Sequence, residues 1–221
     1  YTVAEELITK ATFPAHHPYS HTVLGSMADL DAAKLDDVKE WFKTYYGAAN
    51  AVIVVAGDID ADTALAKVKH YFGDIPAGPP VARHDQWPAK LIESQRQSVH
   101  DRVPQARLIR VYNIPGWGVQ DAVYLDLVSD VLGSGKTSRL FKRLVYDEQL
   151  ATDVMAYQGT SELGSNFAVV ATVRPGGDPA AVERAIKEEV ARFIQKGPTA
   201  DELARARVEH ALHIVREQAP F

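Results

Sequence analysis

The order of apolar and polar positions predicts helical and extended segments in the first third of the chain. Apolar residues recur every three or four positions from Asp31 to Tyr46, which predicts a helix lying on a sheet, with Asp29 or Asp31 as N-cap. The uncharged run Ala51–Ala56 is rich in β-branched residues, which predicts a strand covered on both faces. A second amphipathic helix is expected over Asp60–Phe72, before a stretch rich in Gly and Pro.

From residue 81 on, the sequence predicts a linker followed by a second set of strands and helices. Residues 81–95 contain Pro88 and few periodic apolar positions, which predicts an interdomain linker. Beyond the linker the pattern predicts strands at 97–103, 106–112, 152–158 and 166–173, and helices at 118–132, 138–146, 179–195 and 199–215. The order β-β-α-α-β-β-α-α indicates an α+β fold, in which helices cover an antiparallel-rich sheet.

Two stretches of the sequence resemble one family of enzymes. His17–Asp60 combines H-P-Y, a G-S-x-x-x-L turn, a helix ending in Y-Y and a strand ending in G-D, and Leu132–Leu144 reads L-G-S-G-x-x-S-R-L-F-x-x-L. In this order they resemble the pitrilysin/insulinase family of zinc metallopeptidases, whose fold is like that of the mitochondrial processing peptidases. The resemblance covers nearly the whole chain. It implies a two-domain layout, with 1–80 as the C-terminal part of a metal-carrying first domain, 81–95 as linker and 96–221 as a metal-free second domain.

The zinc site that the resemblance implies is not encoded in these residues. Members of the family cut peptides with the inverted motif H-x-x-E-H and a more distant Glu, and no H-x-x-E-H occurs in the 221 residues. Because Tyr1–Lys10 reads as a helix without a start signal, the chain is interpreted as a fragment. In the parent protein, Zn²⁺ would activate water to hydrolyse peptides or unfolded polypeptides held in a chamber. The fragment itself is expected to be inactive and to supply scaffold and chamber wall, without catalytic, metal or substrate-binding residues.

A second departure from the family concerns the residues that hold substrate. Many active members contribute an Arg and a Tyr in an R-x6-Y arrangement, and the corresponding positions here are Val145 and Thr152. Neither side chain can replace a guanidinium or a phenol. Two alternatives follow by resemblance: a zinc peptidase whose partner subunit carries the Arg/Tyr pair, as a homo- or heterodimer, or a noncatalytic binding or structural subunit that pairs with an active partner.

Histidines near the N-terminus are the first candidate metal ligands. His17 and His21 have the i, i+4 spacing of ligands on one helix face, and His16 adjoins them. Pro18 disfavours a helix at this position, and no carboxylate adjoins the pair. A polar loop near the active-site side of the domain is therefore favoured over a metal site, and a role in lining the substrate chamber stays open.

Acidic and histidine residues on predicted helices offer weaker candidates. The motif Glu209-His210-x-x-His213 could share a metal, but a third ligand is not identifiable, and an amphipathic helix with His at its border is favoured. Glu5 and Glu6 resemble the distal zinc Glu only superficially, because the family's ligand lies upstream, so a solvated helix face is expected.

Two further features have ordinary interpretations. Gly133–Thr137 looks like the end of a phosphate-binding loop, but Asp130 stands where that motif requires Gly, and the segment follows a helix. A helix-to-helix turn is favoured. Trp117 either contacts peptide or covers the following helix.

Composition narrows the classes of function. The chain is 46% hydrophobic and 24% charged, as expected of a globular protein, and its formal charge of -5 argues against nucleic acid or an anionic membrane surface. The absence of Cys excludes disulfides and thiolate zinc ligands. No apolar stretch is long enough to span a bilayer, and no signal peptide is visible. The compartment is not assigned by the residues, and the family type is compatible with a bacterial periplasm.

Overall fold

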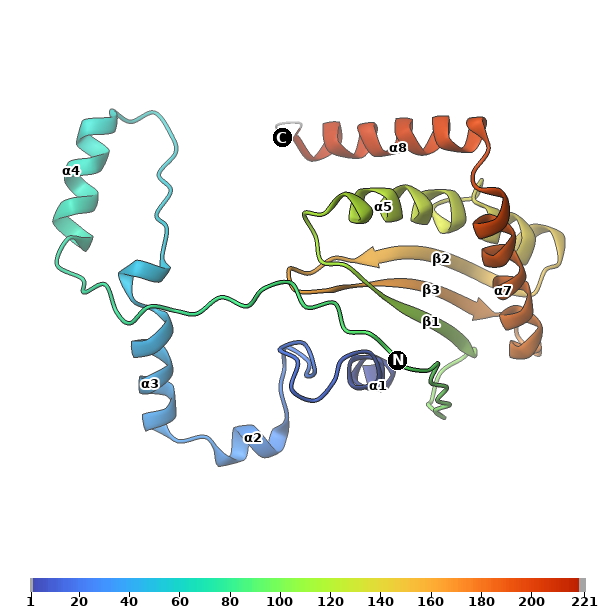
Figure 1. Ribbon diagram of the computed structural model, residues 1–221, viewed down its shortest axis with the longest axis horizontal. Coiled ribbons are helices and arrows are strands. Elements are labelled where there is room, and N and C mark those ends of the chain that lie inside the picture. The colour runs from blue at the N-terminus through green and yellow to red at the C-terminus, as the bar shows by residue number, and fades with distance from the viewer. Residues whose placement is uncertain (1, 219–221) are drawn as a thin grey trace. The chain divides into compact units, whose positions relative to one another are not determined.

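The computed structural model describes residues 2–218. It forms two compact units, Tyr1–Thr22 with Asp85–Phe221 (unit 1) and Val23–His84 (unit 2). Unit 1 contains the following elements: α1 (Thr2–Thr12), β1 (Arg107–Ile114), α5 (Gln120–Gly133), α6 (Arg139–Phe141), the π-helix η2 (Lys142–Asp147), β2 (Ala151–Gly159), β3 (Ser165–Val173), α7 (Pro179–Lys196) and α8 (Ala200–Gln218) (Figure 1).

The sheet of unit 1 is antiparallel throughout and has the strand order β1-β3-β2. Ile109 and Met155 both face Val170 in this register. The α+β class with an antiparallel sheet covered by helices is therefore confirmed. The strand expected at 97–103 is wrong, because these residues form no regular structure.

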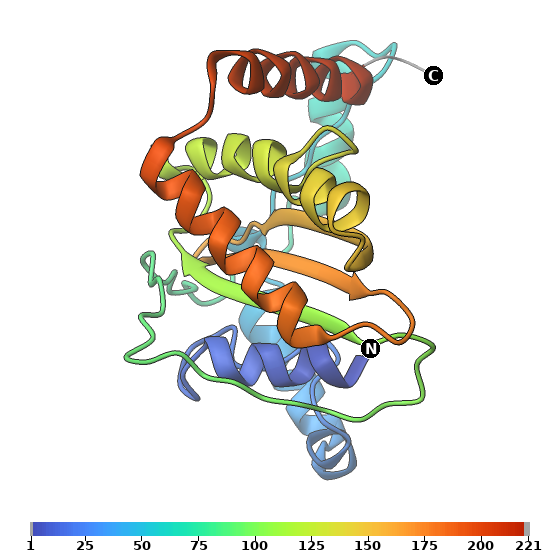
Figure 2. The same ribbon diagram turned by 90° about the vertical axis from the view of Figure 1, so that its right-hand side faces the viewer.

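Helices cover one face of this sheet and bury its apolar side chains. In both views α5 and α1 lie on opposite sides of the sheet (Figures 1 and 2). The core combines one face of the three strands with residues of α5, α6, η2 and α7, and its buried members are Ile114, Leu132, Leu140, Leu144, Ala151, Val154, Ala156, Phe167, Val169, Ala171, Val173, Val182, Ala185 and Ile186. Because successive strand side chains point to opposite faces, the other residues of each strand form a second face of the sheet.

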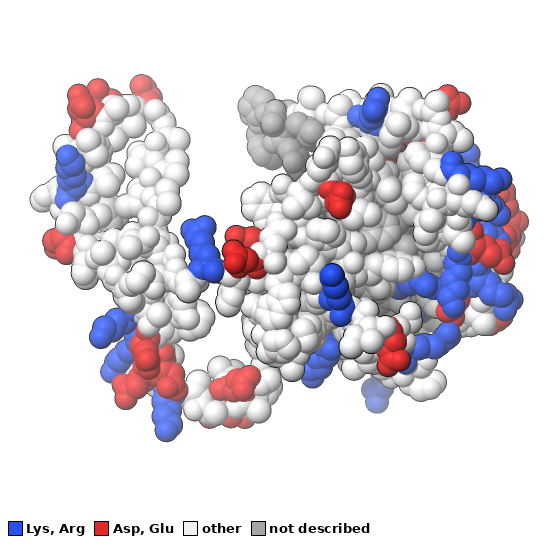
Figure 3. Space-filling view, viewed as in Figure 1, with Lys and Arg blue, Asp and Glu red and all other residues white. Residues whose placement is uncertain are grey.

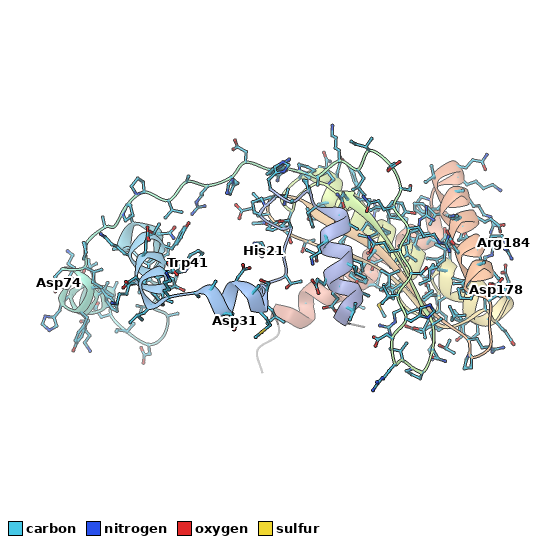
Figure 4. The ribbon with its side chains drawn as sticks, turned by 90° about the horizontal axis from the view of Figure 1, so that it is seen from below. His21, Asp31, Trp41, Asp74, Asp178 and Arg184 are labelled. Atoms are coloured by element: carbon cyan, nitrogen blue, oxygen red, sulfur yellow. The ribbon has the colours of Figure 1, made fainter. Side chains whose placement is uncertain are left out.

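The long helix α7 shows why these residues form a helix. Asp178 accepts a hydrogen bond from the backbone N–H of Ala180 (2.9 Å), and Pro179 fits the first turn, where its missing N–H costs nothing (Figure 4). Gly197, at φ 68°, ends the helix in a backbone conformation that side chains other than Gly rarely adopt. The helices expected at 179–195 and 199–215 are confirmed, with small shifts of their ends.

The helix expected at 138–146 is interrupted. Its first turn is α6, and the remainder widens into η2, where the N–H of Glu148 donates to the carbonyl of Arg143 at 2.8 Å. Leu140 and Leu144 are both fully buried on this segment. Single wide turns of this kind occur frequently at functional sites, and sequence periodicity does not distinguish them from an α-helix.

Unit 2 consists of α2 (Met27–Ala32), α3 (Leu35–Tyr45), the 3-10 turn η1 (Ala48–Asn50) and α4 (Ala61–Phe72). The helix expected at 31–46 is confirmed as α3, but it begins later, after Lys34, because the separate helix α2, capped by the hydroxyl of Ser26, ends at Ala32. Both expected N-caps, Asp29 and Asp31, are wrong, since they lie within α2. The helix α4 is confirmed, with Asp60 as its N-cap.

The strand expected at Ala51–Ala56 is also wrong. The segment has no partner strand among the described residues, and all six of its residues are exposed. Neither α3 nor α4 buries a residue, so α3 does not lie on a sheet here. An extended segment becomes a strand only when another strand satisfies its backbone, and unit 2 supplies none.

Part of the segment interpreted as linker is packed within unit 1. The N–H of Trp87 donates to the carbonyl of Leu163 at 2.6 Å, and Ala89 is buried. Whether residues 81–95 connect two domains of an intact protein stays a prediction. Within residues 2–218 no helix combines the length and the apolar character needed to cross a bilayer.

Candidate functional site

The second face of the sheet carries apolar side chains that no helix fully covers. The register places Ile109, Val170 and Met155 in one row across the three strands, and Val111, Ala168 and Tyr157 in the next. Met155 and Tyr157 on the edge strand are 44% and 45% exposed, Ile109, Val111 and Val170 are half-buried, and the small Ala168 between them is buried. We call these six residues the open face.

Polar rows bound the open face at both ends. At one end Asn113 lies opposite Asn166, and its amide donates to the carbonyls of Thr12 and Ala89, each at 2.7 Å. This contact fixes α1 and the packed segment over that end of the sheet. At the other end Arg107 and Asp153 flank Thr172. The open face is therefore an apolar strip two rows wide between polar borders.

Sequence reasoning did not single out the open face. Its signal was present in the strand Ala151–Gly159, where Val154 and Ala156 point into the core while Met155 and Tyr157 alternate with them. A strand that is apolar on both faces indicates that both faces contact something.

Val145 and Thr152, at the positions of the Arg/Tyr pair, lie on either side of the junction between η2 and β2. Val145 is partly buried and packs against the core. Thr152 is exposed at an irregularity in the β2–β3 pairing, and its hydroxyl lies 3.4 Å from the carbonyl of Thr172. One position thus faces the core and the other faces solvent.

The glycine-rich turn between α5 and α6 serves packing. A Cβ on Gly133 would collide with the backbone of Ala156, so only Gly lets the end of α5 approach β2 this closely. Gly135 adopts φ 69°, and the Ser138 hydroxyl donates to its carbonyl at 2.8 Å. The turn joins two helices, as favoured above, and does not follow a buried strand as a phosphate-binding loop does.

A charged network ties α6 to α7 and α8. Arg139 binds both carboxylate oxygens of Glu202 at 2.7 Å and donates to the carbonyl of Gly197, and Glu189 lies 3.9 Å away. Hydrogen bonds from Arg139 lower the pKa of Glu202 to about 2, although burial opposes the shift and Thr199 adds to it. The same Glu202 bond raises the pKa of Arg139. In Figure 3 basic and acidic side chains are interspersed over the end of unit 1 where α7 lies.

His17 lies in a loop, as expected, but its side chain is buried. Its ring is 1% exposed and packs against Phe13 and Trp87 at centroid distances of 4.7 Å. Its Nδ1 accepts from the N–H of Tyr19 at 3.0 Å, and its Nε2 lies 2.9 Å from the carbonyl of Trp87. Both ring nitrogens are engaged, so His17 packs the loop against residues 85–89 and has no nitrogen left for a metal.

The remaining candidate ligands are dispersed. Glu6 pairs with Lys10 at 2.6 Å on an exposed face of α1, as expected. Nδ1 of His210 lies 3.2 Å from Asp126 of α5, and the side chain of His213 lies outside the described residues. Within the described part of the chain no three His, Cys, Asp or Glu side chains are grouped to hold a metal ion. The described residues therefore do not fit the zinc site that the family resemblance implies.

Asp130, next to that pair, is held among like charges. Burial raises the pKa of Asp130, and the carboxylates of Asp126 and Glu209 raise it further, while His210 and Ser134 oppose the shift. Trp117 precedes α5, and its side chain is 60% exposed; its backbone N–H donates to the carbonyl of Ser161 at 3.0 Å. A contact between this largely exposed ring and peptide stays a prediction.

The fold is an α+β domain with an antiparallel sheet, and its described residues hold no group of three possible metal ligands. Residues 32–208 match the family described as the peptidase M16 inactive domain, and the chain belongs to that family. The match spans both units and includes the L-G-S-G turn, α6 and β2.

Named relatives agree with this family. The chain is 28% identical over 188 residues to the "Zinc protease PqqE" of Helicobacter pylori, covering 82% of this chain and 40% of that protein. It is 26% identical over 219 residues to the "Non-peptidase homolog YmxG" of the same organism, covering 91% of this chain and 46% of that protein. The chain thus spans less than half the length of these relatives.

A solved structure supports the fold. The peptidase M16 inactive domain from Pseudomonas fluorescens superimposes with a TM-score of 0.76 at 22% identity, covering 95% of this chain and 50% of that one. At this identity the likeness establishes the fold alone.

Proposed function

We propose that the chain is part of a zinc-dependent endopeptidase that cleaves peptides or unfolded polypeptides in a chamber, and that it supplies scaffold and chamber wall. In this proposal residues 1–80 belong to the metal-carrying domain, 81–95 connect the domains, and 96–221 form the metal-free domain. The zinc ion and its ligands belong to the intact protein, outside these residues.

The observation that carries the proposal is the difference between the two faces of the sheet. One face is packed by helices, and the other presents the open face, where Met155 and Tyr157 are nearly half exposed. Exposed apolar side chains on a rigid sheet suit contact with the alternating side chains of an extended polypeptide. The polar rows at both ends would keep such a polypeptide over the apolar strip.

The test uses the intact protein encoded by the gene, with an unstructured fluorogenic peptide as substrate. Chelator-sensitive cleavage is expected, and Met155→Glu with Tyr157→Lys should raise KM by about tenfold, which corresponds to about 1.4 kcal/mol of lost binding. Ile194→Lys on α7 is the matched control, because Ile194 is 79% exposed but lies away from the open face. Equal KM values for both variants would contradict a wall role for the open face.

The alternative is a noncatalytic binding or structural subunit that pairs with an active partner. Val145 and Thr152 favour it, because one packs against the core and the other cannot replace a phenol. Intact protein that cleaves nothing, alone or mixed with a subunit carrying the Arg/Tyr pair, would support this alternative. Cleavage only in the mixture would instead support a zinc peptidase with a divided site, acting as a heterodimer.

A further inference from the structure

Aromatic side chains from two distant segments of unit 1 pack together around one backbone position. The ring of His17 stacks on Phe13 and lies against Trp87, each at a centroid distance of 4.7 Å. Tyr19 lies edge-on to Phe13 at 5.7 Å, and its hydroxyl accepts from the N–H of Leu163 at 3.3 Å. The carbonyl of Leu163 accepts from the N–H of Trp87 at 2.6 Å. We call Phe13, His17, Tyr19, Trp87 and Leu163 the latch.

The sequence H-P-Y builds the N-terminal side of the latch. The N–H of Ser20 donates to the carbonyl of His17 at 2.9 Å, which closes a turn with Pro18 at its second position, where the fixed φ of Pro is favoured. Nδ1 of His17 accepts from the N–H of Tyr19, so the proton of the ring is on Nε2 and is donated to the carbonyl of Trp87. A phenylalanine at this position would keep a packed ring and lose both hydrogen bonds.

The contacts of the latch cross the proposed boundary between the two domains. In that layout its three N-terminal residues belong to the metal-carrying domain, whereas Leu163 belongs to the metal-free domain. Trp87 comes from the connecting segment and contacts both, because its ring packs on His17 and its N–H binds Leu163. The turn beside Leu163 permits this approach, since a Cβ on Gly164 would lie only 3.1 Å from the Cα of Pro88.

The latch also lies at both connections to unit 2. The chain leaves unit 1 after Thr22 and returns to it at Asp85. The amide of Asn113 reinforces the same two segments, because it donates to the carbonyls of Thr12 and Ala89, each at 2.7 Å. Both connections are therefore fixed to one end of the sheet by buried contacts.

We propose that the latch positions the metal-carrying domain of the intact protein relative to the metal-free domain, so that the chamber keeps the spacing that a bound polypeptide needs. The inference rests on the proposed function, and in it His17 and Tyr19 are positioning residues that act through the two connections. A loosened latch leaves fewer molecules in the binding-competent arrangement, and the apparent affinity for peptide falls by that fraction. The chemistry of each bound molecule is unchanged.

Amide hydrogen exchange in the intact protein tests the latch itself. In His17→Phe the amides of Tyr19, Trp87 and Leu163 should exchange at least about tenfold faster, and the amide of Val169 in the core should be unchanged. The milder variant Tyr19→Phe loses one hydroxyl and should accelerate Leu163 alone. Unchanged exchange in both variants, or equal acceleration of the core amide, would overturn the proposal.

Peptide binding and turnover test the positioning role. The intact protein is mixed with an unstructured fluorescent peptide, and Kd is measured by anisotropy with a chelator present to stop turnover. In His17→Phe both Kd and KM should rise about fivefold, while kcat stays within about twofold. His17→Gln keeps a donor for the carbonyl of Trp87 and should give intermediate values. A lower kcat with unchanged KM would mean that His17 only maintains the folded fraction, which overturns the proposal.

His100→Phe is the matched control, because His100 is exposed and lies outside the latch. It should change neither amide exchange nor affinity. Protein that binds peptide and cleaves none, with Kd raised in His17→Phe, would contradict the peptidase and support the latch. Cleavage with KM unchanged in His17→Phe would support the peptidase and overturn the latch. Intact protein that neither binds nor cleaves peptide would overturn both.

Discussion

Units 1 and 2 contain similar apolar patterns and use them differently. Val169 on the central strand of unit 1 is fully buried, whereas Val54 in unit 2 is 83% exposed. Likewise α7 buries Val182 and Ile186, and α3 buries no residue. The difference teaches that an apolar helix face or an apolar strand segment becomes part of a core only where another element covers it. Most of the stability of helices and strands comes from this tertiary packing.

A matched pair of Leu→Ala variants should show the largest contrast. Leu140→Ala in the core should cost about 2–5 kcal/mol of unfolding free energy, because it leaves a cavity among fully buried side chains. Leu65→Ala in α4 should change it by less than about 0.5 kcal/mol, because Leu65 is half exposed and Ala favours helix.

The measurement is urea unfolding followed by tryptophan fluorescence. Trp41 lies in unit 2, and the other two tryptophans, Trp87 and Trp117, lie in unit 1. In a Trp41→Phe background the signal therefore reports unit 1 alone. Equal losses in both variants would mean that unit 2 is buried against unit 1 or another copy, and the comparison would fail.

The second-largest contrast between the two units is expected in how acid changes their stability. The pKa of Glu202 is about 2 in the fold against an ordinary 4.5, so its stabilisation is present above pH 4.5 and is lost as pH falls toward 2. Glu202→Gln should remove roughly 2–3 kcal/mol of unfolding free energy at pH 7. It should also reduce the loss of stability between pH 4.5 and pH 2, which is called the acid limb below. In unit 2, hydrogen bonds from Thr63 also lower the pKa of Asp60, but Asp60→Asn should leave the acid unfolding of unit 1 unchanged.

Circular dichroism and Trp87/Trp117 fluorescence, recorded between pH 7 and pH 2 in the Trp41→Phe background, check this expectation. Arg139→Lys is the companion variant, because Lys keeps the charge but cannot bind both oxygens of Glu202. Its acid limb should lie between those of the parent chain and Glu202→Gln. An unchanged acid limb in Glu202→Gln would show that the network does not stabilise unit 1.

The positions of the Arg/Tyr pair offer a contrast within unit 1. Val145→Arg should destabilise by about 1–3 kcal/mol, because the guanidinium enters a partly buried apolar position. Thr152→Tyr should stay within about 0.5 kcal/mol, because Thr152 is exposed. Urea unfolding measures both changes. If Val145→Arg left the unfolding free energy unchanged, η2 would be able to turn this side chain outward, and an Arg/Tyr pair could be introduced at positions 145 and 152.

The same contrast explains what sequence could predict. The strands at 106–112, 152–158 and 166–173 were predictable because their apolar residues have partners within the chain. The pattern at 51–56 was equally strong and gave no strand, because periodicity reports which residues could be buried and not whether a partner strand exists.

The site was less predictable than the fold. The loop position of His17 beside Pro18 was predictable, but the burial of its side chain was not, because Phe13, Tyr19 and the distant Trp87 enclose it and a contact across seventy positions leaves no local signal. The register of three strands creates the open face from residues far apart in the chain. The sequence alone showed that Val145 and Thr152 stand where the R-x6-Y pair would be. The direction in which each side chain points could not be predicted, because it depends on the π-helix η2.

The smallest expected change in stability comes from replacing Asp130, a carboxylate that lies close to two others. Asp130 of α5 faces Asp126 and Glu209, and burial with these carboxylates raises its pKa. A raised carboxyl pKa means that the protonated form is favoured in the fold, so stability falls as pH rises through that pKa. Asp130→Asn should therefore stabilise unit 1 by about 0.5 kcal/mol at pH 7, and by less in acid.

The exposed Asp74 of unit 2 provides the control, and Asp74→Asn should have no effect on unit 1 (Figure 4). Urea titrations at pH 7 and pH 4 distinguish the two. A gain in Asp130→Asn that is independent of pH would show that the new amide stabilises by hydrogen bonding, and not by relieving repulsion between α5 and α8.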